Sequence, residues 1–259
     1  MNLRKYGKSP FKIAVIHGGP GAAGEMAPVA IELSHNYGIL EPLQTKPTIE
    51  EQILELKRII DQNADVPVIL IGWSWGAWLS YLFAARFPRL VNKLILVSSG
   101  PFEEKYAQQI MPTRLNRLST KEREDFDKFV SQIPLATSKQ QSKIFMKVGK
   151  ILSRSDSYNP LPDKTEIQAN YQIYNKVWAE AAELRRNGRL LNECKKIKCP
   201  VIAIHGDYDP HPAEGVKKPL ESLLPNFKFI LLSHCGHTPW LEKEAKNKFY
   251  QLLKNNLNS

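Results

Sequence analysis

The chain alternates short apolar runs with longer segments in which apolar residues recur at helical spacing. Compact apolar runs bounded by glycine, proline or polar residues are typical of buried strands. The predicted strands are FKIAVI (11–16), the weaker YGIL (37–40), VPVILI (66–71), VNKLILVSS (91–99), PVIAI (200–204) and FKFILL (227–232).

Helical patterns separate these runs. Thr48 and Glu51 have the spacing of a capping box, and apolar residues recur on one face from Ile49 to Ile60. Further helices are predicted over 76–87, which Pro88 ends, over 213–224 and over 241–252. Strands that alternate with helices predict an α/β fold, with a mostly parallel sheet of about six strands covered on both faces.

The pattern changes over residues 103–195, where strand-like runs disappear and helices with polar faces replace them. We therefore predict two parts. Residues 1–102 and 196–259 form the α/β core domain, and residues 103–195 form a helical cap inserted between two neighbouring strands.

Composition is ordinary for a soluble globular protein, with 42% hydrophobic and 24% charged residues. The three cysteines, Cys194, Cys199 and Cys235, are too few and odd in number for a disulfide framework, which favours a reducing, cytoplasmic location. Cys194 and Cys199 lack a second close pair, so no metal site is predicted. No secretory signal is visible, because the apolar run after the basic N-terminal residues stops at His17.

The net charge of +10 raises the question of nucleic-acid or membrane binding. Acidic residues are interleaved with the basic ones, as in KEREDFDKF, which is typical of a solvated lysine-rich surface. We therefore expect neither nucleic acid nor a membrane as a partner. The oligomeric state is left open.

Residues 66–85 carry no charge and are long enough to span a bilayer. However, β-branched residues dominate the first half and helix formers the second, with glycines at the junction. This pattern favours a strand that turns into a helix. Gly72-Trp73-Ser74-Trp75-Gly76 is then the G-x-S-x-G pattern of a nucleophile elbow, with Ser74 raised at the turn.

A serine nucleophile needs a base, and the base needs an orienting carboxylate. HGDYDP follows one later strand and HCGH follows the next. Loops at the carboxyl ends of parallel strands gather in one crevice. An aspartate, Asp207 or Asp209, and a histidine, His234 or His237, are therefore expected beside Ser74.

These motifs resemble the α/β-hydrolase superfamily, and HGGPG (17–21) resembles its prolyl aminopeptidase (proline iminopeptidase) branch. The resemblance implies Asp209 as the triad acid, from G-x-x-D, and His237 as the base, from G-H. It also implies an oxyanion hole made by the backbone N–H groups of Gly19 and Trp75. His17 and His205 are expected to have structural roles.

The predicted function is that of a serine hydrolase that cleaves an ester or amide of a small substrate through an acyl-enzyme, without cofactor or metal. The partner is a small-molecule or short-peptide substrate, contacted by Trp73, Trp178 and Glu180, although core packing and a solvated helix face are alternatives for these three. Prolyl-type aminopeptidase activity is one alternative function. A non-enzymatic small-ligand receptor on the same fold is another.

Overall fold

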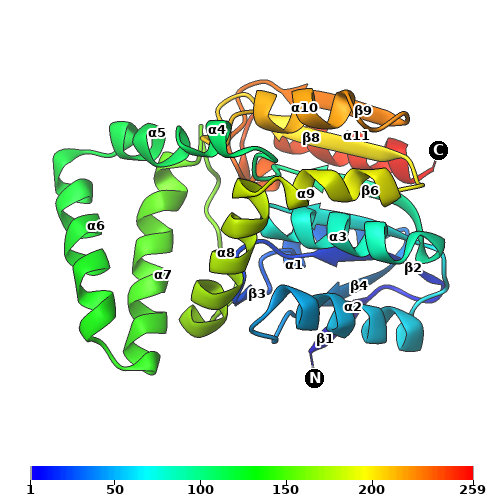
Figure 1. Ribbon diagram of the computed structural model, residues 1–259, viewed down its shortest axis with the longest axis horizontal. Coiled ribbons are helices and arrows are strands. Elements are labelled where there is room, and N and C mark those ends of the chain that lie inside the picture. The colour runs from blue at the N-terminus through cyan, green and yellow to red at the C-terminus, as the bar shows by residue number, and fades with distance from the viewer. Residues whose placement is uncertain (1, 259) are drawn as a thin grey trace.

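The fold is built on a seven-stranded sheet, described here from a computed structural model for residues 2–258 (Figure 1). The strand order is β1-β4-β2-β5-β6-β8-β9, and every neighbouring pair is parallel except β1 with β4. The strands are β1 (Leu3–Tyr6), β2 (Phe11–Ile16), β4 (Gly38–Pro42), β5 (Val68–Trp73), β6 (Val91–Val97), β8 (Val201–Gly206) and β9 (Phe227–Leu232). The predicted α/β fold with a mostly parallel sheet is confirmed.

Helices cover both faces of the sheet, α2 and α3 lying in front of it and α1 and α11 behind it in Figure 1. The helices of this part are α1 (Ala27–Ser34), α2 (Ile49–Asn63), α3 (Trp75–Arg86), α10 (Glu214–Glu221) and α11 (Lys246–Leu257). Thr48 caps α2 by accepting the Glu51 N–H, as its spacing predicts.

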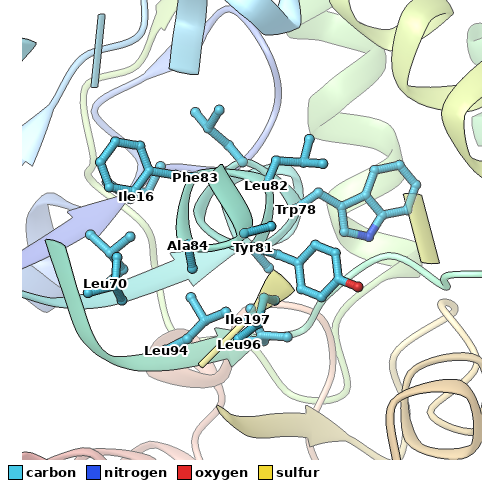
Figure 2. Close-up of a cluster of buried hydrophobic side chains, with 14 of the residues drawn as sticks. Ile16, Leu70, Trp78, Tyr81, Leu82, Phe83, Ala84, Leu94, Leu96 and Ile197 are labelled. Carbon is cyan, nitrogen blue, oxygen red and sulfur yellow. The ribbon is translucent and has the colours of Figure 1, made fainter. Parts of the chain in front are cut away.

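The two faces of the sheet bury separate apolar clusters. Ala14 and Ile16 point into the α3 side, whereas Ile13 and Val15 point into the side covered by α1 and α11. Figure 2 shows the first cluster, in which α3 residues such as Phe83 pack over strands β5 and β6. Full burial of one such side chain contributes about 1.5–3 kcal/mol. Burial on both faces explains the apolar strand sequences.

The segment between β6 and β8 is mainly helical. Its helices are α4 (Glu104–Ala107), α5 (Ile110–Arg117), α6 (Thr120–Gln132), α7 (Ser138–Ser155), α8 (Tyr171–Arg186) and α9 (Arg189–Asn192). The α6–α7 hairpin projects away from the sheet at the left of Figure 1. We propose that residues 103–195 are the cap of the core made by 1–102 and 196–259.

Four features differ from the prediction. The sheet has seven strands rather than about six, because β1 was not predicted. Strand β1 is a partly exposed edge strand containing Arg4 and Lys5, so it lacks the apolar run that marks a buried strand. Helix α1 was also missed, and the C-terminal helix spans 246–257 rather than 241–252, since Pro239–Leu241 form a separate 3-10 turn.

The fourth difference is a strand pair that joins the segment 103–195 to the core. Strand β3 (Ala22–Ala23), just after the HGGPG loop, pairs with β7 (Gln168–Ala169). Two-residue strands carry no detectable sequence period, which is why neither was predicted.

Residues 66–85 form β5, a turn and α3, so the reading of this stretch as a continuous membrane helix is wrong. Within residues 2–258, no helix is both long and apolar enough to cross a membrane.

Candidate active site

Ser74 occupies the sharp turn between β5 and α3, with φ +53° and ψ −116°. A side chain rarely adopts this backbone conformation, so the surrounding turn must enforce it. A Cβ on Gly72 would collide with the Gly76 carbonyl, and one on Gly76 would collide with the Ile16 carbonyl. Glycine at both positions therefore allows the chain to turn and present the Ser74 hydroxyl.

Asp209 and His237 meet at the carboxyl ends of β8 and β9. His237 Nδ1 lies 2.8 Å from Asp209 Oδ2, and both residues are 7% exposed. If Nδ1–H donates to the carboxylate, Nε2 keeps the lone pair that a general base needs. The alternative pair of residues does not make this contact: the Asp207 carboxylate accepts the Cys235 N–H, and His234 is exposed against Tyr158.

Trp73 connects this pair to the elbow. Its indole N–H donates to the His237 carbonyl at 2.7 Å, and its ring centroid lies 5.2 Å from that of His237. Trp73 directly precedes Ser74, so the serine follows a residue that contacts the histidine. The elbow and the Asp209–His237 pair therefore lie at one end of the sheet.

A second histidine binds the same carboxylate, and sequence reasoning missed it. His211 places Nδ1 2.8 Å from Asp209 Oδ1, and its backbone N–H donates to the same oxygen at 2.9 Å. Its ring stacks on His237 with centroids 4.4 Å apart. A histidine two positions after the candidate acid was the only signal, and spacing alone does not show which groups that side chain contacts.

The charges at this cluster favour an ionised Asp209 carboxylate. Burial opposes ionisation of Asp209, but His237 and then His211 hold the pKa of the carboxyl well below its usual range. Burial lowers the pKa of His211 to about 4 and also lowers the pKa of His205. Near neutral pH, His211 is therefore an uncharged hydrogen-bond donor.

The same cluster has the composition of a possible metal site. One ligand atom from each of Asp209, His211 and His237 lies within 4.8 Å of the others. A metal ion must lie in the plane of each imidazole that binds it. The His211 and His237 rings are stacked, with an interplanar angle of 26°, and each Nδ1 already contacts one oxygen of Asp209 at 2.8 Å. This geometry favours a hydrogen-bonded cluster over a metal centre.

The HGGPG loop lies against the elbow. A Cβ on Gly18 would lie 3.1 Å from Ser74 Cβ, and Gly19 has a left-handed φ of +28°. His17 Nδ1 bonds the Gly18 carbonyl, and Nε2 accepts the Gln44 N–H. Burial lowers the pKa of His17 to about 4, so its imidazole is uncharged near neutral pH and holds the loop through these two hydrogen bonds. Trp75 is the first residue of α3, where backbone N–H groups lack intrahelical partners.

A cavity of about 520 Å³ lies beside the site, between the core and α7. Trp73 and Thr238, the neighbours of Ser74 and His237, form part of its wall, and Phe145 and Met146 of α7 also line it. Its lining is mostly apolar, which suits an acyl chain.

Glu25 also lines this cavity, and its Oε2 is buried without a hydrogen-bond partner within residues 2–258. Burial raises the pKa of Glu25 well above the ordinary 4.5, and the nearby Asp163 adds to this increase. The folded state therefore favours the protonated carboxyl.

Glu25→Gln is expected to stabilise the fold at pH 8 and to change little at pH 4. The folded pKa is raised, so the native state loses stability as pH rises above the unfolded value, and the neutral amide avoids this loss. We expect a gain on the order of 1 kcal/mol at pH 8, measured by urea unfolding at both pH values. The exposed Glu221→Gln is the control, and an equal gain there, or a gain at pH 4, would contradict the assignment.

Two of the three expected substrate contacts lie elsewhere. Trp178 stacks on Trp78 of α3 at 5.9 Å and packs against the core cluster. Glu180 accepts the Ile49 N–H at the start of α2, where a carboxylate meets the positive end of the helix dipole. Trp73, in contrast, contacts His237 and lines the cavity. Of these three residues, only Trp73 contacts the Asp209–His237 pair in the part of the chain that the structure describes, residues 2–258.

The segment after α7 supports the histidine loop. The Asp156 carbonyl accepts the His237 N–H at 2.8 Å, while the Asp156 carboxylate forms a two-bond ion pair with Arg114 of α5. The buried Glu242 carboxylate accepts backbone N–H groups from Gly236 and from Tyr158. Charge-assisted contacts of this kind are stronger than neutral ones, so the segment 103–195 is firmly attached to the site.

A family model described as the alpha/beta hydrolase fold matches residues 1–244. The chain belongs to the α/β-hydrolase family. The superfamily resemblance and the predicted α/β-hydrolase fold are confirmed, whereas the prolyl aminopeptidase branch is not.

Among its relatives in the α/β-hydrolase family, the pimeloyl-[acyl-carrier protein] methyl ester esterase of Nitrosomonas europaea is 24% identical over 66% of this chain. That match spans 64% of the esterase, just under two thirds of its length. The esterase of the same name from Legionella pneumophila is 24% identical over 93% of both chains. The structure of VinJ superimposes with a TM-score of 0.71 at 16% identity, covering 99% of this chain and 94% of VinJ, which shows a shared fold.

Proposed function

We propose that this α/β hydrolase is a serine esterase that cleaves a small carboxylic ester through an acyl-enzyme on Ser74. The observation that carries the proposal is the 2.8 Å contact of Asp209 with His237, beside a strained elbow that holds Ser74. The methyl ester esterases among its relatives support an ester rather than a peptide substrate.

In the proposed mechanism, Ser74 Oγ attacks the ester carbonyl while His237 Nε2 accepts the hydroxyl proton. Asp209 holds Nδ1–H and stabilises the imidazolium that forms. His237 then gives the proton to the departing alkoxide, and the alcohol leaves. Water, deprotonated by the same imidazole, then attacks the acyl-enzyme. His237 returns this proton to Ser74 Oγ as the acyl–oxygen bond breaks, and the acid leaves.

The negative charge on the carbonyl oxygen needs donors that are already in place. We assign this role to the N–H groups of Gly19 and Trp75, because the HGGPG loop and the start of α3 flank Ser74. Removal of one such donor in comparable enzymes costs about 3–4 kcal/mol of transition-state stabilisation. Trp73 and the 520 Å³ cavity are proposed to accept the acyl group.

A panel of substrates tests this function. Aryl esters with a series of acyl-chain lengths are compared with prolyl and other aminoacyl arylamides, using kcat/KM. We expect ester turnover that depends on chain length and exceeds arylamide turnover. Stronger arylamide turnover would instead favour the aminopeptidase alternative. No turnover of either class, with no labelling of Ser74 by a fluorophosphonate, would favour a ligand receptor.

One observation favours an ester carried on an acidic protein. Residues 128–155 contain six basic residues and no acidic one. Five of them lie along α7, and two of these, Lys150 and Arg154, line the cavity. A methyl ester linked to an acyl carrier protein therefore belongs in the panel. A lower KM for it than for the free ester, lost at high salt, would identify the carrier as part of the substrate.

A further inference from the structure

The acid of the proposed triad is shared by two imidazoles, only one of which the mechanism uses. Asp209 directs Oδ2 at His237 and Oδ1 at His211, each at 2.8 Å from Nδ1. His211 is 7% exposed and stacks on His237. A buried side chain that contacts both the acid and the base of a site can fix the position of one relative to the other.

The loop holds His211 rigidly in this position. Pro210 and Pro212 flank it and restrict the backbone on both sides. Its own N–H bonds Asp209 Oδ1, an Asx-type turn that closes the loop on the carboxylate. From β8, His205 Nε2 bonds the His211 carbonyl at 2.8 Å. The His211 ring therefore does not depend on a ligand for its orientation.

We propose that His211 is a positioning residue for ester hydrolysis: it holds Oδ1 of Asp209 so that Oδ2 faces His237, and its ring supports the His237 ring. The inference rests on the proposed function, because it concerns the same acid and base. It adds a residue that the G-x-x-D and G-H motifs do not contain.

The charge state of His211 matters for this role. A cation bound to Oδ1 would neutralise Asp209 and weaken its stabilisation of the imidazolium at His237. The groups facing His211 are Asp209, His237 and Arg114, with His205 on its carbonyl. Burial and the two basic neighbours keep the pKa of His211 near 4, so it donates a hydrogen bond without bringing a charge.

Two substitutions separate hydrogen bonding from packing. His211→Phe keeps a ring over His237 and loses the donor, whereas His211→Asn keeps a donor that reaches Oδ1 and loses the ring. We expect His211→Phe to lower kcat about 10- to 100-fold with KM within about twofold of wild type. We expect His211→Asn to recover most of that loss.

The pH profile is the readout that a merely structural role would not move. A carboxylate that loses a donor attracts a proton or a cation more strongly. The acid limb of kcat/KM is therefore expected at higher pH in His211→Phe than in wild type, and near its original position in His211→Asn. Unchanged kcat and pH limb in His211→Phe, or equal loss in both variants, would overturn the proposal.

His234→Asn is the matched control. His234 is exposed and has φ +54°, a conformation that asparagine tolerates, and we expect unchanged kcat and pH profile. A loss equal to that of His211→Phe would show that any histidine change in these loops disturbs the enzyme, and would also overturn the proposal.

A measurement without substrate keeps this inference separate from the esterase proposal. NMR of the protein labelled with ¹⁵N-histidine is expected to show Nδ1 protons on both His211 and His237, with the His211 signal absent in His211→Phe. If only the ester panel fails, the esterase proposal is contradicted, but the NMR evidence for the His211 Nδ1 proton still holds. Absence of the His211 Nδ1 proton in wild type would overturn the role of His211, even if esters are cleaved or His211→Phe does not fold.

Discussion

Ser74→Ala is expected to lower kcat for ester hydrolysis by about 10⁴-fold or more while leaving the fold intact. The substitution removes the only atom that would form the acyl-enzyme, but leaves the Asp209–His237 contact and the cavity in place. Alanine also retains the Cβ that the turn already accommodates. Steady-state kinetics on an aryl ester, together with thermal unfolding, measures both effects.

Ser80→Ala is the matched control for this experiment. Ser80 lies on α3 close to the elbow, and its hydroxyl is buried without a partner within residues 2–258. Its removal is expected to leave kcat unchanged. Equal activity of Ser74→Ala and wild type would exclude the acyl-enzyme mechanism.

Asp209→Asn is expected to lower kcat by about 10⁴-fold, whereas Asp207→Asn should remain close to wild type. An amide at position 209 presents N–H or a weak acceptor to His237, so the imidazole no longer keeps its proton on Nδ1. The His211 donors would then also face an uncharged group.

The comparison of Asp209→Asn with Asp207→Asn tests which of the two aspartates is the triad acid, since strand order alone allows either. Both lie in the loop after β8, but the Asp207 carboxylate accepts the Cys235 N–H and is exposed. Ester hydrolysis is measured at several pH values. Low activity at every pH indicates that His237 no longer acts as a base, whereas a shifted pH optimum indicates only an altered titration. A greater loss in Asp207→Asn than in Asp209→Asn would transfer the role of the acid to Asp207.

Sequence reasoning succeeded where burial leaves a simple pattern. Strands β2, β5 and β6 are buried on both faces, so their residues form apolar runs that stand out from the rest of the chain. It failed where burial is partial or local. Strand β1 lies at an exposed edge, and β3 and β7 are too short to show a period.

The same limit applies to the site. The order of the strands indicated that an aspartate and a histidine would meet at one end of the sheet, and Asp209 and His237 do so. The contacts of His211 and Glu180, and the burial of Glu25, depend on side-chain directions and on segments distant in sequence. Glu180, for example, contacts the Ile49 N–H, 131 positions away, which no local pattern indicates.

The hydrogen bond from the His237 amide to the Asp156 carbonyl limits how this protein can be engineered. A minimal core made by deleting residues 103–195 would leave that amide without its acceptor, and the Glu242 carboxylate without its Tyr158 donor. Chimeras that exchange the α6–α7 hairpin for one from another hydrolase should therefore be joined before residue 156, so that the transplanted part ends short of these anchors.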